Sequence, residues 1–303
     1  MSLCDCLFNI DGVPFVHLLT RACNPVSFFL LLSGYGMYIV YQKGDRHRFT
    51  RIARQYIHHW VVLTIFLIIG VFAFNKSIGS FITIISNYTG FEATYNGELW
   101  FLFPYVLLAV TSPYLFHFTD RYSTKYVLII LCFIGFCTSF LISRYGDAFF
   151  YHNYWAYNPL LYFHLMFSFY LGAMSAKHRT FEAISVHKVA PYLKKYGVLL
   201  LILLIIIRLF FRTSAFHAFY VYAFIALFLN INRPEFLDKV LAFLGKHSMN
   251  MWMIHSWFCY YLFKDFIYGF RYPLLILIVL LTVSLISSML VDMICKPITK
   301  RIS

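Results

Sequence analysis

The sequence predicts an all-α fold, a polytopic integral membrane bundle of about nine transmembrane helices in which residues 1–303 form a single membrane-embedded domain. Three observations support this prediction. The chain is 61% hydrophobic and only 12% charged, whereas a soluble domain carries about 25% charged residues. Apolar runs recur along the whole length, and several approach the ~20 residues that span ~30 Å of hydrocarbon. The runs are continuous, whereas the strands of a membrane barrel would alternate apolar and polar residues.

The candidate spans follow one another in a regular order, separated by polar or basic connections. They cover residues 24–42, 56–74, 99–117, 125–143, 160–175, 197–212, 216–231, 248–263 and 273–295. The sixth and seventh are short and joined by a tight turn, which indicates a tilted pair or a hairpin beside a cavity.

The cysteines predict neither a disulfide framework nor a metal site. Cys4 and Cys6 are too close to bridge easily, and four others lie in apolar runs, where cysteine behaves as a small hydrophobic residue. The chain contains no C-x-x-C motif and no Cys/His metal-ligand spacing.

Basic residues gather on one side of the predicted membrane topology. Of the 25 Lys and Arg residues, 18 fall in alternate loops and at the C-terminus. The positive-inside rule makes that side cytoplasmic. Topology alone can explain the bias. The alternative is a cytoplasmic site for an anionic ligand.

The densest basic segment contains Arg48, Arg51 and Arg54, called the arginine run below. Residues spaced three apart lie near one another on a helix surface. The planar guanidinium group binds phosphate through paired hydrogen bonds, so the arginine run is suited to a phosphate-containing ligand.

Three segments together carry a family resemblance. The stretch 27–36 reads SFFLLLSGYG and is followed by a basic loop and the arginine run. The stretch 98–102 reads ELWFL and opens a span. The stretch 244–250 reads LGKHSMN and is followed by His255. In this order and spacing the segments resemble the acyltransferase 3 family of integral membrane proteins, most closely its polysaccharide O-acetyltransferase members.

The resemblance implies an acyltransferase that moves an acetyl group from cytoplasmic acyl-CoA to a hydroxyl of an extracytoplasmic carbohydrate. It implies a multi-pass protein of the bacterial inner membrane. Acyl-CoA is then a co-substrate rather than a bound cofactor, and the partners are the lipid bilayer, acyl-CoA and a surface polysaccharide or other glycan, with no nucleic acid. Two alternatives stay open: an inactive relic of the family, and a transporter of polysaccharide or lipid-linked sugar.

Three residues are catalytic candidates, because polar groups within a bilayer are costly and tend to be functional. His255 lies mid-span, where it would handle a proton or orient the acceptor; alternatively it hydrogen-bonds between helices. Glu98 opens a span at the outer side, where it would orient the acceptor or pair with an arginine; alternatively it is an interfacial residue beside Trp100. Arg21 precedes the first span and would bind the acceptor or a carbonyl oxygen, unless it is a plain interfacial arginine.

The donor site is expected at the cytoplasmic end of the bundle. There the arginine run would bind the CoA phosphates. The resemblance places Ser33 and Gly34 near the region of acyl transfer, and the alternative is that these small residues let helices pack closely.

Two further predictions concern polar residues near the inner face. His58 and His59 follow the arginine run and are expected at the headgroup level, with a ligand role as the alternative. Asp292 is expected to pair with Lys296, which lies at i+4 on the same helix.

The chain departs from the family pattern at its start. The family begins with a helix that carries an arginine and then a histidine, which is thought to activate the acceptor hydroxyl. Residues 1–22 do not supply such a helix, and His17 is the only histidine among them. We therefore expect the first helix of the family to be absent from this chain, through a late start codon or a truncated gene.

Overall fold

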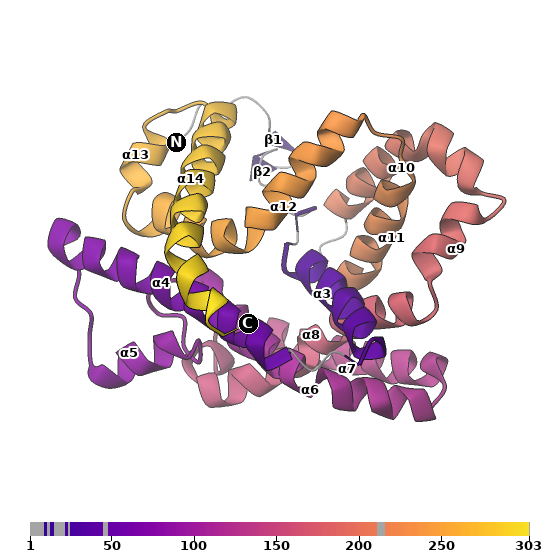
Figure 1. The fold of residues 1–303 in the computed structure, drawn as a ribbon, viewed down its shortest axis with the longest axis horizontal. Helices are drawn as coiled ribbons and strands as arrows, with labels where there is room; N and C mark the ends of the chain where they lie inside the picture. Colours follow the sequence, from indigo (N-terminus) through magenta and orange to yellow (C-terminus); the bar gives the residue numbers. More distant parts are fainter. Residues whose placement is uncertain are drawn as a thin grey trace. The chain divides into compact units, whose positions relative to one another are not determined.

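The computed structural model describes residues 9–10, 13–14, 22–23, 25–44, 48–210 and 216–302, and this part of the chain is almost entirely helical (Figure 1). Strand β1 (Asn9–Ile10) pairs antiparallel with β2 (Val13–Pro14). The predicted all-α class is confirmed. The helices are α3 (Pro25–Gln42), α4 (Arg48–Phe74), α5 (Phe81–Tyr88), η1 (Gly97–Phe101), α6 (Leu102–Arg121), α7 (Thr124–Tyr145), η2 (Phe150–His152), α8 (Tyr154–Lys177), α9 (Thr180–Val186), α10 (Ala190–Phe210), α11 (His217–Asn230), α12 (Glu235–Ser256), η4 (Trp257–Tyr261), α13 (Lys264–Tyr268) and α14 (Pro273–Lys300).

Several of these helices have the dimensions of membrane spans. Within the described residues, five helical segments are long and apolar enough to cross a membrane, and α11 is a shorter apolar helix. The five are Phe49–Phe74, Gly97–Arg121, Thr124–Tyr145, Tyr154–Lys177 and Pro273–Lys300. The described parts of all nine predicted spans fall largely on helices, so the continuous apolar runs identified the helices correctly.

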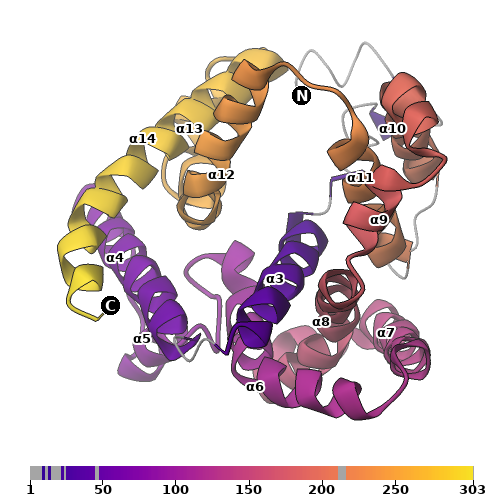
Figure 2. The same ribbon diagram turned by 45° about the vertical axis from the view of Figure 1, so that its right-hand side comes forward.

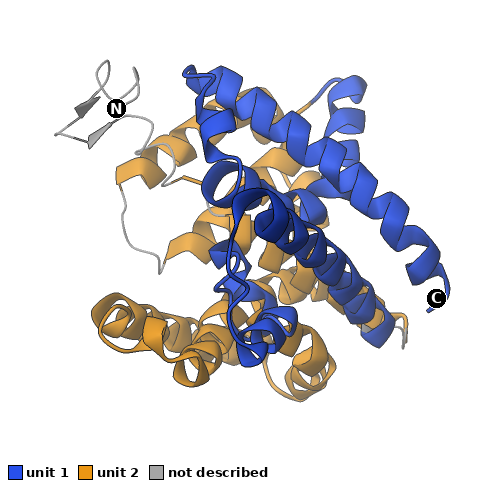
Figure 3. Ribbon diagram, turned by 90° about the vertical axis from the view of Figure 1, so that its left-hand side faces the viewer, with its two compact units in different colours: residues 1–7, 47–103, 233–303 blue, residues 8–46, 104–232 orange. Residues whose placement is uncertain are grey.

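The chain divides into two compact units, which Figure 3 colours separately. Unit 1 consists of residues 1–7, 47–103 and 233–303, and unit 2 of residues 8–46 and 104–232. That residues 1–303 form a single membrane-embedded domain stays a prediction. The units are described one at a time below.

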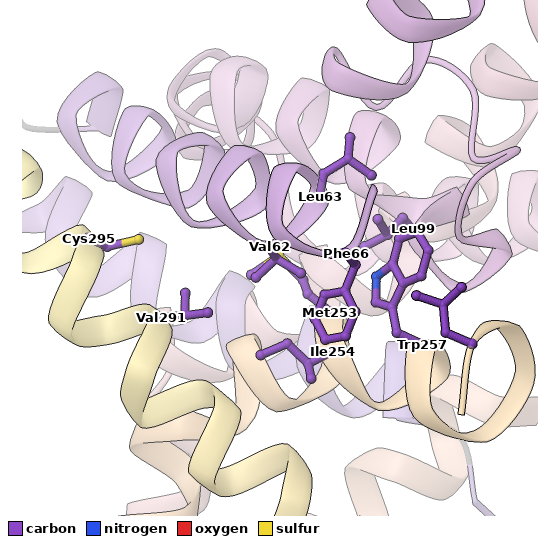
Figure 4. Close-up of a cluster of buried hydrophobic side chains, with 10 residues drawn as sticks. Val62, Leu63, Phe66, Leu99, Met253, Ile254, Trp257, Val291 and Cys295 are labelled. Atoms are coloured by element: carbon purple, nitrogen blue, oxygen red, sulfur yellow. The ribbon is translucent and has the colours of Figure 1, made fainter. Parts of the chain in front are cut away.

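Unit 1 is held together by a cluster of apolar side chains from α4, α12 and α14 (Figure 4). The ring of Phe66 stacks on the indole of Trp257, with 5.3 Å between centroids and 7° between planes. Met253 and Ile254 of α12 are fully buried in the same cluster, and Val291 brings in α14. Within a bilayer, helices associate through close packing of their side chains rather than through removal from water, so the cluster fixes the three helices against one another.

Unit 2 is organised around the contact between α3 and α8, which lie side by side in Figures 1 and 2. Aromatic rings fill the space beside this contact. Phe116 of α6 lies parallel to Phe169 of α8, with 6.2 Å between ring centroids. The same Phe116 ring meets Tyr38 of α3 edge to face at 5.2 Å. Three helices of unit 2 therefore share one aromatic core.

Side-chain caps set where several helices begin. The hydroxyl of Ser80 accepts a hydrogen bond from the Thr83 amide at the start of α5. The side chain of Asn153 accepts from the Ala156 amide at the start of α8. Such caps satisfy amides that have no partner within the helix. Pro273 at the first position of α14 needs no such partner, because proline has no amide hydrogen.

Candidate functional site

His255 is the catalytic candidate whose chemistry the structure defines best. It is half-buried near the end of α12, and its Nδ1 lies 2.7 Å from the carbonyl oxygen of Trp252. A carbonyl oxygen can only accept a hydrogen bond, so Nδ1 carries the proton. The neutral ring then keeps an unprotonated Nε2. This is the tautomer that a general base needs.

The turn before Glu98 is tied directly to the helix that carries His255. Asn96 is buried, and its amide nitrogen donates to the carbonyl of Met253 at 3.1 Å. Its side-chain oxygen accepts from the hydroxyl of Ser256 at 2.8 Å and from the Glu98 amide at 3.2 Å. One asparagine thus fixes the backbone of Glu98 relative to α12, close to His255.

Glu98 lies on η1 and His255 on α12, and these two elements are in contact. Trp252 and His255 stand at i and i+3 on α12, so they are neighbours on its surface. Phe101, one 3₁₀ turn after Glu98, packs its ring 4.4 Å from that of Trp252. The structure therefore brings these two predicted residues into one region, although no hydrogen bond or ion pair joins them in the described part of unit 1.

The helix geometry changes directly after His255. Residues Trp257–Tyr261 form the π-helical turn η4, in which the Leu262 amide donates to the carbonyl of Trp257 at 2.9 Å. Such turns are rare and occur often at functional sites. The hydroxyl of Tyr261 in this turn accepts from the Gly97 amide at 2.7 Å. The widened turn therefore gives η1 a further attachment.

A cavity of about 190 Å³ lies beside the π-helical turn. The indole nitrogen of Trp257 lies buried among the residues around it and has no hydrogen-bond partner among the described residues. Aromatic walls with a few polar groups are typical of ligand sites. The lining residues are Phe66, Leu67, Gly70, Val71, Lys76, Ser77, Ile78, Thr94, Tyr95, Trp257, Tyr261 and Leu262. The sequence analysis did not identify this site, because its aromatic residues look like the many others in the chain.

The arginine run lies at the beginning of α4, as predicted. Arg51 and Arg54 are exposed on the first turns of this helix. The backbone of Arg48 begins the helix, and its side chain lies outside the described part of the structure. Two of the three predicted phosphate ligands thus project from one helix end.

A hydrogen-bonded polar cluster follows the arginine run. Nδ1 of His58 donates to the side-chain oxygen of Asn250 at 2.9 Å, and the amide nitrogen of Asn250 donates to Asp292 at 2.7 Å. Nδ1 of His247 lies 3.0 Å from the other oxygen of Asp292 and 3.1 Å from the hydroxyl of Ser288. The cluster joins α4, α12 and α14.

Asp292 thus has partners that the sequence analysis did not predict. We expected an ion pair with Lys296, whereas this carboxylate contacts Asn250, His58 and His247. A spacing of four residues is visible within one helix, but contacts between helices depend on their packing. Sequence spacing therefore gave no signal for this cluster.

The remaining predicted site residues lie in unit 2. A Cβ added to Gly34 would stand 1.8 Å from the carbonyl oxygen of Phe169, and one added to Gly172 would stand 1.9 Å from that of Leu31. Gly34 therefore serves the close contact of α3 with α8, which was the stated alternative for this residue. Ser33 is half-buried on α3, and Arg21 lies outside the described residues.

Comparison with known proteins shows that the chain belongs to the acyltransferase 3 family. The family model Acyl_transf_3, described as an acyltransferase domain, matches residues 10–293. No curated protein and no solved structure matches the chain.

Proposed function

We propose that this membrane acyltransferase, which belongs to the acyltransferase 3 family, transfers an acetyl group from cytoplasmic acyl-CoA to a hydroxyl of an extracytoplasmic carbohydrate. The proposed location is the bacterial inner membrane, with a surface polysaccharide or other glycan as the acceptor. One observation carries the catalytic part of the proposal: the carbonyl of Trp252 holds His255 with its Nε2 available as a base.

The reaction needs one proton transfer to start. Nε2 of His255 removes the proton of the acceptor hydroxyl while the oxygen attacks the carbonyl carbon of the thioester. The new carbon–oxygen bond forms, and the carbon–sulfur bond breaks. CoA leaves as a thiolate and takes up the proton that His255 removed, which returns the imidazole to its neutral form. Glu98 accepts a hydrogen bond from the acceptor and so orients it beside His255.

The donor end of the proposed reaction is the beginning of α4. Acyl-CoA carries several phosphates, and Arg51 and Arg54 are exposed there on the side predicted to be cytoplasmic. Charge-assisted hydrogen bonds from guanidinium groups to phosphate are about twice as strong as those between neutral groups. This supports acyl-CoA as the donor.

The acceptor end of the proposed reaction is the cavity beside η4. Its walls include the rings of Tyr95, Trp257 and Tyr261, and Thr94 and Lys76 add polar groups. The hydrogen bond from Gly97 to Tyr261 connects this wall with the turn that carries Glu98. A carbohydrate presents both apolar faces and hydroxyls, and this combination suits such a lining.

Acetylation of the acceptor tests the proposal. Membranes containing the wild-type protein or His255→Gln would receive acetyl-CoA labelled in the acetyl group, and label in polysaccharide would be measured by mass spectrometry. We expect a loss of about 100-fold or more in His255→Gln, as for removal of a general base. The matched control is His178→Gln, because His178 is exposed in unit 2 and contacts Thr124 at 3.0 Å. Equal labelling by wild type and His255→Gln would contradict the proposal.

A further inference from the structure

We propose that His58 is an additional ligand for the anionic donor, and that Asn250 and Asp292 hold it in place, so that donor binding strengthens as the pH falls. The inference deepens the proposed function and rests on it, because the ligand is the CoA part of the donor. It concerns a residue outside the arginine run. It adds a dependence on pH that arginine alone cannot supply, since a guanidinium group stays charged.

The position of His58 on α4 supports a shared site with the arginines. Arg51, Arg54 and His58 recur at i, i+3 and i+7, which places them on one face of the helix. The next residue, His59, has a different environment. It is 1% exposed and its Nε2 bonds the carbonyl of Asn87 at 3.0 Å, whereas the side chain of His58 is 22% exposed. Of these two histidines, His58 is the one that a ligand can reach.

Hydrogen bonds fix which ring nitrogen of His58 is available. The amide nitrogen of Asn250 donates to Asp292, so the side-chain oxygen of Asn250 is the atom that faces His58. That oxygen can only accept, and Nδ1 of His58 therefore carries a proton. The remaining nitrogen, Nε2, makes no hydrogen bond to another described residue. In the protonated ring, Nε2–H is a donor for a phosphate oxygen.

His247 completes the coordination of the carboxylate. Its side chain is 7% exposed, and its Nδ1 lies 3.0 Å from the second oxygen of Asp292. Ser288 is fully buried against the same nitrogen at 3.1 Å. The buried imidazole is thus committed to Asp292, and the more exposed His58 remains for a ligand.

The charge of this cluster depends on His58. With both imidazoles neutral, Asp292 leaves one negative charge against His58, one helical turn along α4 from Arg54, and this charge opposes an anion. When His58 is protonated, its Nδ1 lies 3.6 Å from Asp292, and the opposite charges balance. Within about two helical turns of His58, Asn250 and Asp292, the other charged or titratable residues on their own helices are Arg51, Arg54, Tyr56, His59, Lys246, His247, His255, Cys295 and Lys296. The lysines and arginines keep their charge near neutral pH, so the imidazoles supply the change.

A metal ion is a different possible use for histidines and a carboxylate. Within the described residues, no three His, Cys, Asp or Glu side chains are arranged to hold a metal. The Nδ1 atoms of His58 and His247 both serve hydrogen bonds within the cluster. The arrangement is thus that of hydrogen-bonded imidazoles.

Binding of CoA at two pH values tests the inference. Purified wild-type protein, His58→Gln and the control His178→Gln would be titrated with CoA by calorimetry at about pH 5.5 and about pH 8, on either side of the ordinary imidazole pKa of about 6.5. At the lower pH, wild type and His178→Gln should each bind CoA about tenfold more tightly than His58→Gln does, as expected for a charge-assisted hydrogen bond. At the higher pH this difference between the variants should be much smaller. The comparison between variants cancels the protonation of the CoA phosphate, whose second pKa is about 6.

Asp292→Asn gives an independent reading. It removes the negative charge but keeps the shape of the side chain, so CoA affinity at the higher pH should rise and the dependence on pH should flatten. Weaker binding by Asp292→Asn at the higher pH, or the same pH dependence in wild type and His58→Gln, would overturn the inference. Absence of CoA binding by wild type at both pH values would instead reject the proposed function.

Discussion

The two units of the molecule bury polar chemistry in different ways. In unit 1, side chains from three helices bond to one another: Asn250 bonds His58 and Asp292, and Asn96 bonds Ser256. In unit 2, the central contact depends on glycines, which let the backbones of α3 and α8 touch. The first arrangement holds functional groups in place through other side chains. The contact of α3 with α8 instead brings glycines, which have no side chain, against the backbone of the other helix. Such a contact is suited to a structural role.

Unit 2 also contains a small polar pocket, which allows a histidine of unit 2 to be compared with His255 of unit 1. His164 lies 3.3 Å from the hydroxyl of Thr138 and 3.4 Å from that of Ser139. These contacts join neighbouring helices α7 and α8 within a pocket of about 40 Å³. In unit 1, Nδ1 of His255 instead donates to the backbone carbonyl of Trp252, so its Nε2 is the acceptor. This contact favours unit 1 as the location of the proposed base.

The largest expected effect concerns the scaffold contact. Gly34→Ala places a Cβ 1.8 Å from a backbone oxygen, so α3 and α8 must separate. We expect a loss of at least about 3 kcal/mol of stability, seen as a large fall in the melting temperature in detergent. Gly36→Ala is the matched control on the same helix, because nothing lies within 4 Å of its added Cβ. Equal melting temperatures for the two variants would show that the close contact of α3 with α8 does not determine the stability of unit 2.

The next effect concerns the donor end of unit 1. Replacing Arg51 and Arg54 together by Gln should raise the KM for acetyl-CoA about 100-fold, because each charge-assisted hydrogen bond contributes about 1.5–3 kcal/mol. The control removes two charges from unit 2 through Lys194→Gln and Lys195→Gln, both exposed. A similar KM for both double variants would mean that overall basic charge, rather than this helix end, attracts the donor.

A smaller effect is expected at the turn before Glu98. Asn96→Ala removes the bonds to Met253 and Ser256, so Glu98 loses its fixed position. We expect kcat to fall about tenfold and stability to fall by about 1–3 kcal/mol. Asn153→Ala removes a helix cap in unit 2 and should cost stability alone. Steady-state kinetics with thermal unfolding would separate the two variants, and a wild-type kcat for Asn96→Ala would contradict the assigned role.

The smallest effect is expected at a partly exposed ion pair of unit 2. Lys177 lies 2.9 Å from Asp120 at the end of α8. Exposed pairs contribute about 0–1 kcal/mol, so Lys177→Met should change the melting temperature little and leave the KM for acetyl-CoA unchanged. A marked rise in KM would show that unit 2 also binds the donor.

The sequence predicted the helices for a simple physical reason. Continuous apolar runs are local signals, and so is the spacing of Arg51 and Arg54 along α4. His255 became a catalytic candidate because an imidazole within an apolar span is costly, and its role stays a prediction. The contact of His58 with Asn250 joins residues 192 positions apart, and no local pattern encodes it. The choice between the two roles of Gly34 likewise needed the position of α8.

The cavity and the π-helical turn were beyond sequence reasoning for related reasons. Trp257 and Tyr261 are two aromatic residues among many, and their role depends on the loop that brings Thr94 and Tyr95 beside them. The turn itself differs from an α-helix by one hydrogen-bond register, because the Leu262 amide donates to the carbonyl of Trp257, five residues earlier. Composition does not distinguish the two registers.

The central claim is that unit 1 performs the transfer with His255 as the base. Its most direct test compares single-turnover acetyl transfer and CoA affinity in the same preparations of wild type and His255→Gln. We predict that His255→Gln transfers the acetyl group at least about 100-fold more slowly than wild type. Its CoA affinity should be unchanged, because His255 is on α12 whereas the arginine run is on α4. Transfer by His255→Gln at the wild-type rate would contradict the claim.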